Sequence, residues 1–237
     1  MRKSLQLSLT AMFAALHAVL YFISFGLWRN WGIYLASVEG IILGPKFGFS
    51  AAFLGCIIGR LVRPDAFWMF GIVAEPLSVL MAGFLAKAKW KSVLVAYAIM
   101  LSAYFVHPFG SSLPLWTILD VLLALFLLYP SAKFGKYLFE NNFKHLSISL
   151  VLVSFVCIAT DSLVRIFLLV PCGLHGLFFK GFDELYFVFV GAALDSFVED
   201  GLVVAVSLLV GAPLLLAISK FDFLKRKQSK TENGKSL

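Results

Sequence analysis

The chain has 237 residues, of which 61% are apolar and only 14% are charged. A soluble domain carries about 25% charged residues, so this composition leaves too little polar surface to cover a soluble globule. The formal net charge of +7 lies mostly in short gaps between apolar stretches and in the C-terminal tail. Membrane topology and anionic lipid therefore explain it better than nucleic acid does.

Eight apolar stretches follow one another along the chain. The first, 5–27, is long enough to cross a hydrocarbon core of roughly 30 Å. Its short basic start precedes no convincing cleavage site, which favours an uncleaved helix over a signal peptide. The other stretches are 32–43, 47–62, 67–86, 93–106, 115–128, 146–170 and 185–219. The second and fifth are short, so we expect either tilted spans or half-helices of re-entrant hairpins.

The eighth stretch, at about 35 residues, exceeds the length of one span. We therefore expect a break at one of three helix-weakening residues, Gly201, Gly211 or Pro213.

Lysine residues gather in every second gap between the stretches, at Lys46, at 87–91, at 133–144 and in the tail from 220. Under the positive-inside bias, these gaps and both termini face the cytoplasm. We predict an all-α, polytopic transmembrane helix bundle of six to eight spans in the cell membrane. A single bundle covers residues 1–224, and a polar, basic tail at 225–237 is expected to be disordered.

Small residues recur at every fourth position. They form two pairs in the first stretch, Ala11 with Ala15 and Ala14 with Ala18, and a ladder further on at Gly40, Gly44, Gly48, Gly55 and Gly59. This spacing lets helices approach closely. It favours ordinary packing inside the bundle, or, for the alanine pairs, a docking stripe for another membrane subunit.

The basic N-terminus, the alanine-spaced first helix and the segment EGIILGPKFGFSAAFLGCIIGRL resemble the substrate-binding S components of energy-coupling factor (ECF) transporters. In that family, short second and third helices meet at a Gly-Pro-type turn, matched here by Gly44 and Pro45, and glycines follow at four-residue spacing. The resemblance covers roughly residues 1–90. It implies that Ala11 and Ala15 contact a shared transmembrane coupling subunit, which works with separate ATPase subunits.

Ionisable side chains lie inside several stretches, where each costs on the order of 3 kcal/mol or more without a partner or a cavity. One interpretation is neutralisation in place, between Asp161 and Arg165 and between Arg60 and either Glu75 or Glu39. The other is a polar pocket for a ligand with an anionic group, because the cations outside the basic gaps are mostly arginine. We predict a substrate site formed by Glu39, Arg60, Glu75, Asp120 and Arg165, with Trp31 and Trp68 as stacking surfaces.

The last outer loop carries Phe178, Phe179 and Phe182. These rings are expected either to cover a pocket or to dip into the membrane interface.

The sequence lacks a glycine-rich loop ending in Gly-Lys-Ser/Thr and any His-Glu-x-x-His motif. Its three cysteines, Cys56, Cys157 and Cys172, show no paired spacing, so no metal site, cofactor or enzyme activity is expected. The leading hypothesis is an ECF-type S component that binds a vitamin or other small nutrient.

Two alternatives remain open. The first is a self-sufficient secondary transporter, in which Glu75, Asp120 or Glu199 binds a coupling proton. The second is a membrane-embedded prenyl or lipid enzyme, in which Asp195 and Glu199 bind a magnesium diphosphate.

Overall fold

The computed structural model describes residues 3–23, 29–64, 67–140 and 142–220, and all regular structure in these ranges is helical. The prediction of an all-α fold is therefore confirmed. The predicted tail at 225–237 lies outside the described residues.

The helices are α1 (Lys3–Tyr21), α2 (Ala36–Leu43), α3 (Pro45–Val62), α4 (Trp68–Ala86), α5 (Trp90–Val106), α6 (Pro108–Ser112), α7 (Leu119–Gly135), α8 (Phe143–Leu169) and α9 (Phe182–Val206). Shorter 3₁₀ segments are η1 (Trp31–Leu35), η2 (Leu115–Ile118) and η3 (Leu174–Leu177).

Six helical segments of the described chain are long and apolar enough to cross a membrane, which makes this a membrane-embedded protein. They are Ser4–Tyr21, Pro45–Val62, Trp68–Ala86, Leu115–Gly135, Phe143–Leu169 and Phe182–Lys220. The second and fifth predicted stretches form the shorter helical segments Trp31–Leu43 and Trp90–Val106. All eight predicted stretches are thus helical, and the two that the sequence marks as short are the two short ones.

The predicted break in the last stretch is wrong. Helix continues from Phe182 to Lys220, because the π-helical turn η4 (Ser207–Gly211) is inserted just before Pro213. Such a turn adds one residue to the local repeat, which accommodates a proline without ending the helix.

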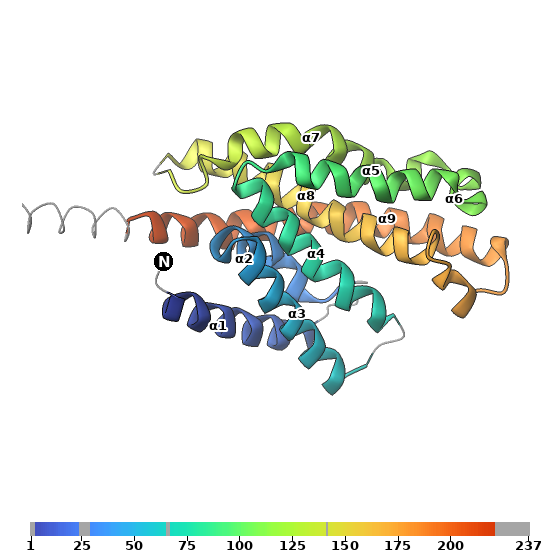
Figure 1. Cartoon of the computed structure of the whole chain (residues 1–237), viewed down its shortest axis with the longest axis horizontal. Coiled ribbons are helices and arrows are strands. Elements are labelled where there is room, and N and C mark those ends of the chain that lie inside the picture. Colours follow the sequence, from blue (N-terminus) through green and yellow to red (C-terminus); the bar gives the residue numbers. More distant parts are fainter. Residues whose placement is uncertain (1–2, 24–28, 65–66, 141, 221–237) are drawn as a thin grey trace, which may run out of the picture.

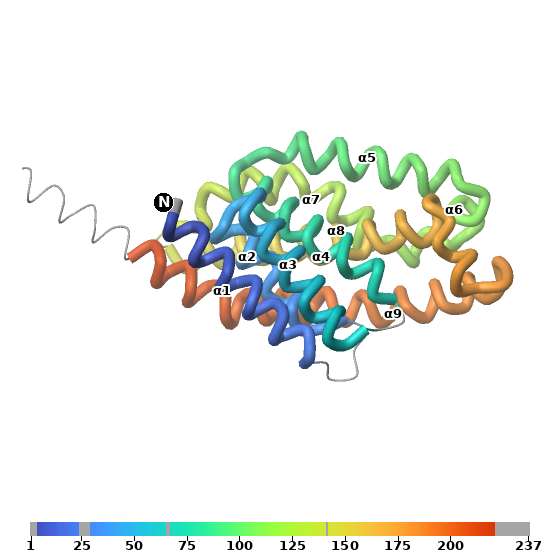
Figure 2. Tube along the Cα trace, turned by 60° about the horizontal axis from the view of Figure 1, so that its bottom comes forward, coloured from blue at the N-terminus to red at the C-terminus, as the bar shows by residue number. Residues whose placement is uncertain are grey.

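The helices lie roughly along one long axis (Figure 1). The start of α1, the α2–α3, α4–α5 and α7–α8 connections and the end of the last helix all lie at the left of that view, which we call the Lys-rich end. Figure 2 shows the same grouping from another side. The opposite, Lys-poor end carries α6 and the α8–α9 connection. The structure therefore gathers the predicted basic gaps at one end.

The glycine ladder packs helices inside the bundle. Gly44 has φ +76° and turns α2 into α3, a conformation that glycine adopts without steric cost. A Cβ at Gly40 would collide with the backbone of α4, and one at Gly55 with the backbone of α1. Ala14 and Ala18 are buried at 5% and 7% exposure. Both therefore pack inside the bundle and do not belong to an exposed docking stripe. Of the two alanine pairs on α1, only Ala11 and Ala15 are exposed.

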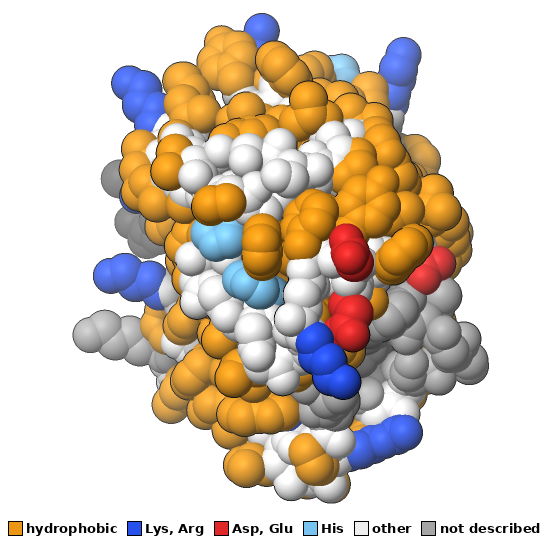
Figure 3. Space-filling view, turned by 90° about the vertical axis from the view of Figure 1, so that its right-hand side faces the viewer, with side chains coloured by type: hydrophobic (Ala, Val, Ile, Leu, Met, Phe, Trp, Pro, Cys, Tyr) orange, Lys and Arg blue, Asp and Glu red, His pale blue; other side chains and the backbone are white. Residues whose placement is uncertain are grey.

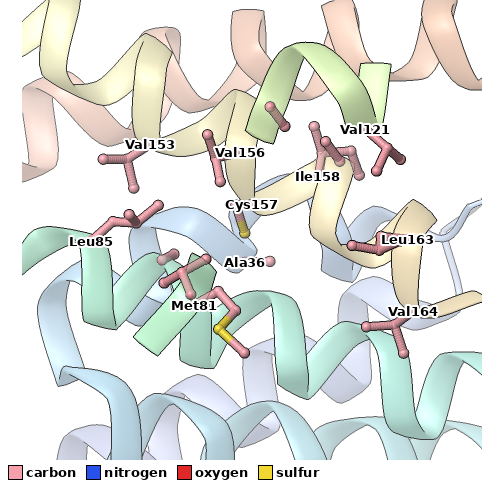
Figure 4. Packing of buried hydrophobic residues seen from close by; sticks show 14 of the residues in the cluster. Ala36, Met81, Leu85, Val121, Val153, Val156, Cys157, Ile158, Leu163 and Val164 are labelled. Atoms are coloured by element: carbon pink, nitrogen blue, oxygen red, sulfur yellow. The ribbon is translucent and has the colours of Figure 1, made fainter. Parts of the chain in front are cut away.

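The apolar core lies between α4 and α8. Figure 4 shows Met81 and Leu85 of α4 near Val156 and Cys157 of α8, in the middle of the bundle. This seam fixes the relative position of the two helices that carry Glu75 and Asp161.

Candidate functional site

The first polar cluster lies where α1, α2, α3 and α4 meet, and we call His17, Glu39, Cys56, Arg60 and Glu75 the His17 cluster. The imidazole bridges two carboxylates, with Nδ1 3.1 Å from Oε2 of Glu39 and Nε2 3.1 Å from Oε2 of Glu75. The thiol of Cys56 donates to the same oxygen of Glu75 over 3.1 Å. All five residues are buried.

Arg60 donates to the other oxygen of Glu75, Oε1, over 2.5 Å. Its guanidinium also lies over the ring of Tyr21, 4.9 Å from the centroid. Gly71 makes room for the guanidinium of Arg60 beside Glu75, because a side chain at this position would overlap that guanidinium. The predicted Arg60–Glu75 pair is confirmed, whereas Glu39 is paired with His17.

The second cluster surrounds Arg29, just after the gap in the described chain, and we call Arg29, Asp161, Ser162, Glu199 and Asp200 the Arg29 cluster. The guanidinium lies 3.3 Å from Glu199, 3.2 Å from Asp200 and 3.5 Å from Asp161. It also donates to Ser162 over 2.7 Å. Arg29 lies in the connection between α1 and η1, yet it is only 7% exposed, because its guanidinium contacts three buried carboxylates.

Arg165 and Asp161 join the two clusters. The predicted pair is confirmed, with Nε of Arg165 2.7 Å from Oδ2 of Asp161. Nη2 of Arg165 lies 3.3 Å from Glu75 of the His17 cluster, and Asp161 also contacts Arg29. One continuous charged network therefore crosses the bundle.

This network holds more acid than base. Asp120 of α7 interacts with Asp200 and Arg29 and so joins it. Within the described chain, six buried carboxylates (Glu39, Glu75, Asp120, Asp161, Glu199 and Asp200) face three guanidiniums (Arg29, Arg60 and Arg165) and the imidazole of His17. Because isolated charges are costly in an apolar interior, the surplus requires protons or a bound cation.

A cavity of about 210 Å³ lies on one side of this network. Its polar floor contains Arg29, Asp120, Ser162, Arg165, Ser196 and Glu199. Its walls are largely apolar and include Phe67, Phe70, Ile166, Leu169, Phe179 and Phe189. Four of these wall residues come from the parts of α4, α8 and α9 nearest the Lys-poor end, and Phe67 and Phe179 come from the connections just before α4 and α9. Figure 3 looks onto that end, where apolar side chains predominate around a few acidic, histidine and Lys or Arg side chains.

The structure divides the predicted substrate site. Asp120 and Arg165 line the cavity, and Glu75 lies behind Arg165. Glu39 and Arg60 belong to the His17 cluster and do not line it.

The predicted stacking residues Trp31 and Trp68 also lie outside the cavity lining. Trp31 stacks on Tyr34 with centroids 5.3 Å apart. Trp68, the first residue of α4, is 45% exposed, and the residue before it, Phe67, lines the cavity instead. Phe179 lines the cavity, which is one of the two placements expected for it, while the ring centroid of Phe178 lies 5.0 Å from that of Phe67.

Sequence reasoning missed His17 and Cys56. One signal was available for His17, an ionisable residue flanked by Ala14 and Ala18 inside an apolar stretch. Asp195 and Glu199, the pair considered for magnesium, have different environments: Asp195 is exposed, whereas Glu199 is buried against Arg29. Glu199 therefore already pairs with a cation of the chain itself.

Comparison with known proteins adds little about function. No family model matches the chain, and no solved structure matches it. Among curated proteins, the uncharacterized protein MJ0923 of Methanocaldococcus jannaschii is 29% identical over 131 residues. The match covers 54% of this chain and 44% of that relative, so it spans less than half of the relative's length.

Proposed function

We propose that this protein binds a small solute at its Lys-poor end and carries it across the membrane. The observation that carries the proposal is the cavity of about 210 Å³, with its apolar walls and charged floor. Sites for drug-sized ligands usually measure roughly 300–1,000 Å³, so this cavity suits a smaller metabolite. The positive-inside bias assigns the Lys-poor end to the outside, where a solute for uptake is met.

The ligand is an amphipathic solute with an anionic or strongly hydrogen-bonding group. In the cavity floor, Nε and Nη2 of Arg165 bind Asp161 and Glu75, while Nη1 makes no hydrogen bond within the described residues. This donor is available to a carboxylate or phosphate oxygen. The phenylalanine rings of the wall, among them Phe70, Phe179 and Phe189, suit an apolar or aromatic body.

In its specific form, the proposal is a substrate-binding S component of an ECF-type transporter for a vitamin or other small nutrient. Two features support this form: the resemblance over roughly residues 1–90, and the exposed pair Ala11 and Ala15 on α1. Small residues at four-residue spacing on a lipid-facing surface suit close helix packing. A transmembrane coupling subunit would dock there, and separate ATPase subunits would supply the energy.

Ligand binding is tested with the purified chain in lipid nanodiscs, by a thermal-shift screen of small metabolites followed by calorimetry. Ala193 is 5% exposed in the cavity wall, and Ala193→Phe should fill the cavity and abolish binding. Ala98→Phe, at an exposed position of α5, is the matched control and should leave affinity unchanged. A solute that binds both variants with equal affinity would show that the cavity is not the site.

Subunit docking is tested by affinity purification of tagged protein from its native host. Ala11→Trp should remove the coupling and ATPase subunits from the purified complex while solute binding persists, and Ala98→Trp should retain them. If wild-type protein brings down no ATPase-bearing complex, the ECF form of the proposal fails while solute binding stands.

The acid-rich network supports a second candidate, a self-sufficient secondary transporter coupled to protons. Six buried carboxylates against three guanidiniums provide sites where protons can be held and released. Proteoliposomes separate the two candidates. Uptake by the purified chain alone, driven by a pH gradient, supports the secondary transporter, whereas uptake only with added ATPase subunits supports the S component.

A further inference from the structure

We infer that His17, Cys56 and Glu75 form a binding site for a divalent transition-metal ion of the zinc type. The three residues come from α1, α3 and α4, and their ligand atoms all lie within 4.8 Å of one another. Each residue is buried. The inference concerns the His17 cluster and does not depend on the solute that the cavity binds.

The spacing of the donor atoms fits one shared metal. Nε2 of His17 lies 3.1 Å from Oε2 of Glu75, and Sγ of Cys56 lies 3.1 Å from that oxygen and 3.3 Å from that nitrogen. Around a tetrahedral zinc ion, with bonds of about 2.0 Å to nitrogen or oxygen and about 2.3 Å to sulfur, ligand atoms lie roughly 3.3–3.5 Å apart. Outward shifts of a few tenths of an ångström would therefore create the coordination geometry.

The surroundings of the three donors match those of known metal sites. Nδ1 of His17, the nitrogen that would not bind metal, contacts Glu39 at 3.1 Å, which is the carboxylate–histidine–metal arrangement. Arg60, Asn30 and Arg165 all bind Oε1 of Glu75. Oε2 of Glu75 is left to face the thiol and the imidazole.

Gly32 keeps the metal side of the imidazole clear. A Cβ at this position would lie 2.9 Å from Nε2 of His17, so any larger residue would crowd the donor. Three protein ligands leave one coordination position for water or a small ligand, as in open zinc sites.

Charge balance favours a divalent ion. Around His17, the carboxylates of Glu39, Glu75 and Asp161 face the guanidiniums of Arg60 and Arg165, which leaves one negative charge in surplus. Arg29 also contacts Asp161, but it faces two further carboxylates and so does not remove this surplus. A divalent cation displaces the thiol proton of Cys56 to solvent and forms a metal–thiolate bond. The metal–thiolate unit carries one net positive charge and cancels the surplus. A proton on His17 would supply the same charge, so the experiment must separate metal from proton.

The donor set also selects the metal. Thiolate and imidazole ligands favour zinc and neighbouring transition metals, whereas magnesium and calcium prefer oxygen ligands alone. Once bound, the ion would tie α1, α3 and α4 together through Glu75, which contacts Arg165 in the floor of the solute cavity.

Cobalt(II) titration of the full chain tests the site. The protein is purified in detergent, its tag is removed, it is treated with a chelator, and the exposed Cys172 is replaced by serine. We expect about one cobalt per chain, a thiolate-to-cobalt charge-transfer absorption band, loss of that band on adding zinc, and a higher thermal midpoint with metal. A folded protein that shows no such band at any cobalt concentration overturns the inference in favour of a purely hydrogen-bonded cluster.

Variants assign the band to named ligands. Cys56→Ser should abolish it, whereas Cys157→Ser, at the other buried cysteine, should retain it. Glu39→Gln should weaken cobalt binding by about 10- to 100-fold, the usual effect of removing an outer-shell partner. A band that survives Cys56→Ser would overturn the assignment. If Cys56→Ser does not fold, Glu39→Gln decides, because unchanged cobalt affinity in that variant would also overturn it.

Discussion

The His17 cluster contains Glu75 and the cavity reaches it through Arg165, and the two regions differ in how their charges are used. In the His17 cluster, buried polar side chains from α1, α2, α3 and α4 contact one another directly. In the cavity, Arg165 and Glu199 border open space behind phenylalanine walls. The cluster is closed to anything larger than an ion, whereas the cavity admits a molecule. Substitutions on the two sides should therefore give different losses, stability on one side and affinity on the other.

The largest effect is expected at Glu75, the residue that both sides share. Glu75→Gln keeps the shape but removes the charge that faces Arg60, Arg165 and His17. Breaking a buried ion pair from one side costs about 3–5 kcal/mol. Denaturant unfolding in detergent micelles should show a loss of this size, or no folded protein at all.

The matched control is Glu140→Gln, because Glu140 is 46% exposed and pairs with the equally exposed His145. Exposed pairs contribute about 0–1 kcal/mol, so this variant should unfold like wild type. Equal stability of Glu75→Gln and wild type would mean that Glu75 is protonated or otherwise uncharged in the folded protein.

The next effect concerns packing beneath the His17 cluster. A Cβ at Gly55 would lie 2.7 Å from Cβ of His17 and 2.8 Å from the carbonyl oxygen of Ala14. Gly55→Ala must therefore push α1 from α3, and overpacking of this kind costs about 1–3 kcal/mol. The free energy of unfolding should fall by that amount, with solute affinity less affected because no residue of α1 or α3 lines the cavity.

Gly191→Ala on α9 is the control, since a Cβ there meets no atom within 4 Å. Alanine favours a helix over glycine by roughly 0.5–1 kcal/mol, so Gly191→Ala should be neutral or slightly stabilising. A loss of stability as large as that of Gly55→Ala would contradict the packing argument.

Much of this fold could be predicted from the sequence, because membrane helices and their ends are marked by local patterns of apolar residues and lysines. Apolar length located all eight helical stretches, and lysine position indicated which connections share an end. Charge was informative in pairs on one helix, as with Asp161 and Arg165, since a spacing of four residues puts both on one face. The π-helical turn before Pro213 was not predictable, because backbone adjustment at a proline depends on neighbouring helices.

The site was only partly predictable, because its donors come from helices far apart in the chain. His17, Cys56 and Glu75 have no recognisable spacing, and only the packing of α1, α3 and α4 brings them together. Arg29 precedes the η1 segment and reads as an interfacial arginine until the carboxylates of α8 and α9 are placed beside it. The choice between Trp68 and Phe67 depended on helix orientation, which apolar composition does not reveal.

On the cavity side, Phe179→Ala should reduce affinity more than stability. Phe179 lines the cavity and is only partly buried. Its removal therefore enlarges a cavity that already exists and should cost little stability. Losing one aromatic contact with the solute should weaken binding about tenfold, or about 1.4 kcal/mol, by calorimetry in nanodiscs. Phe126→Ala, at a position 79% exposed on α7, should leave affinity unchanged. If both variants bind alike, the walls contribute no recognition.

The smallest effect is expected where buried polar groups carry no charge. Oγ of Ser154 donates to Ser37 over 2.9 Å, and Ser37 in turn lies 3.0 Å from Ser207 at the π-helical turn. These hydroxyls are as buried as Glu75. Ser154→Ala removes one hydrogen bond but leaves Ser37 with its second partner, and such bonds between membrane helices contribute about 0.6 kcal/mol on average.

Ser50→Ala, at an exposed position of α3, gives the baseline for replacing a serine in this protein. The difference between Ser154→Ala and that baseline should be several-fold smaller than the loss in Glu75→Gln, measured by the same unfolding assay. Losing the partner of a buried hydroxyl would then cost little free energy of unfolding, whereas leaving a buried charge without its partner would cost much more. If Ser154→Ala is as damaging as Glu75→Gln, polar burial rather than charge holds α1, α3, α4 and α8 together, and the charge-balance argument for an ion at His17 loses its basis.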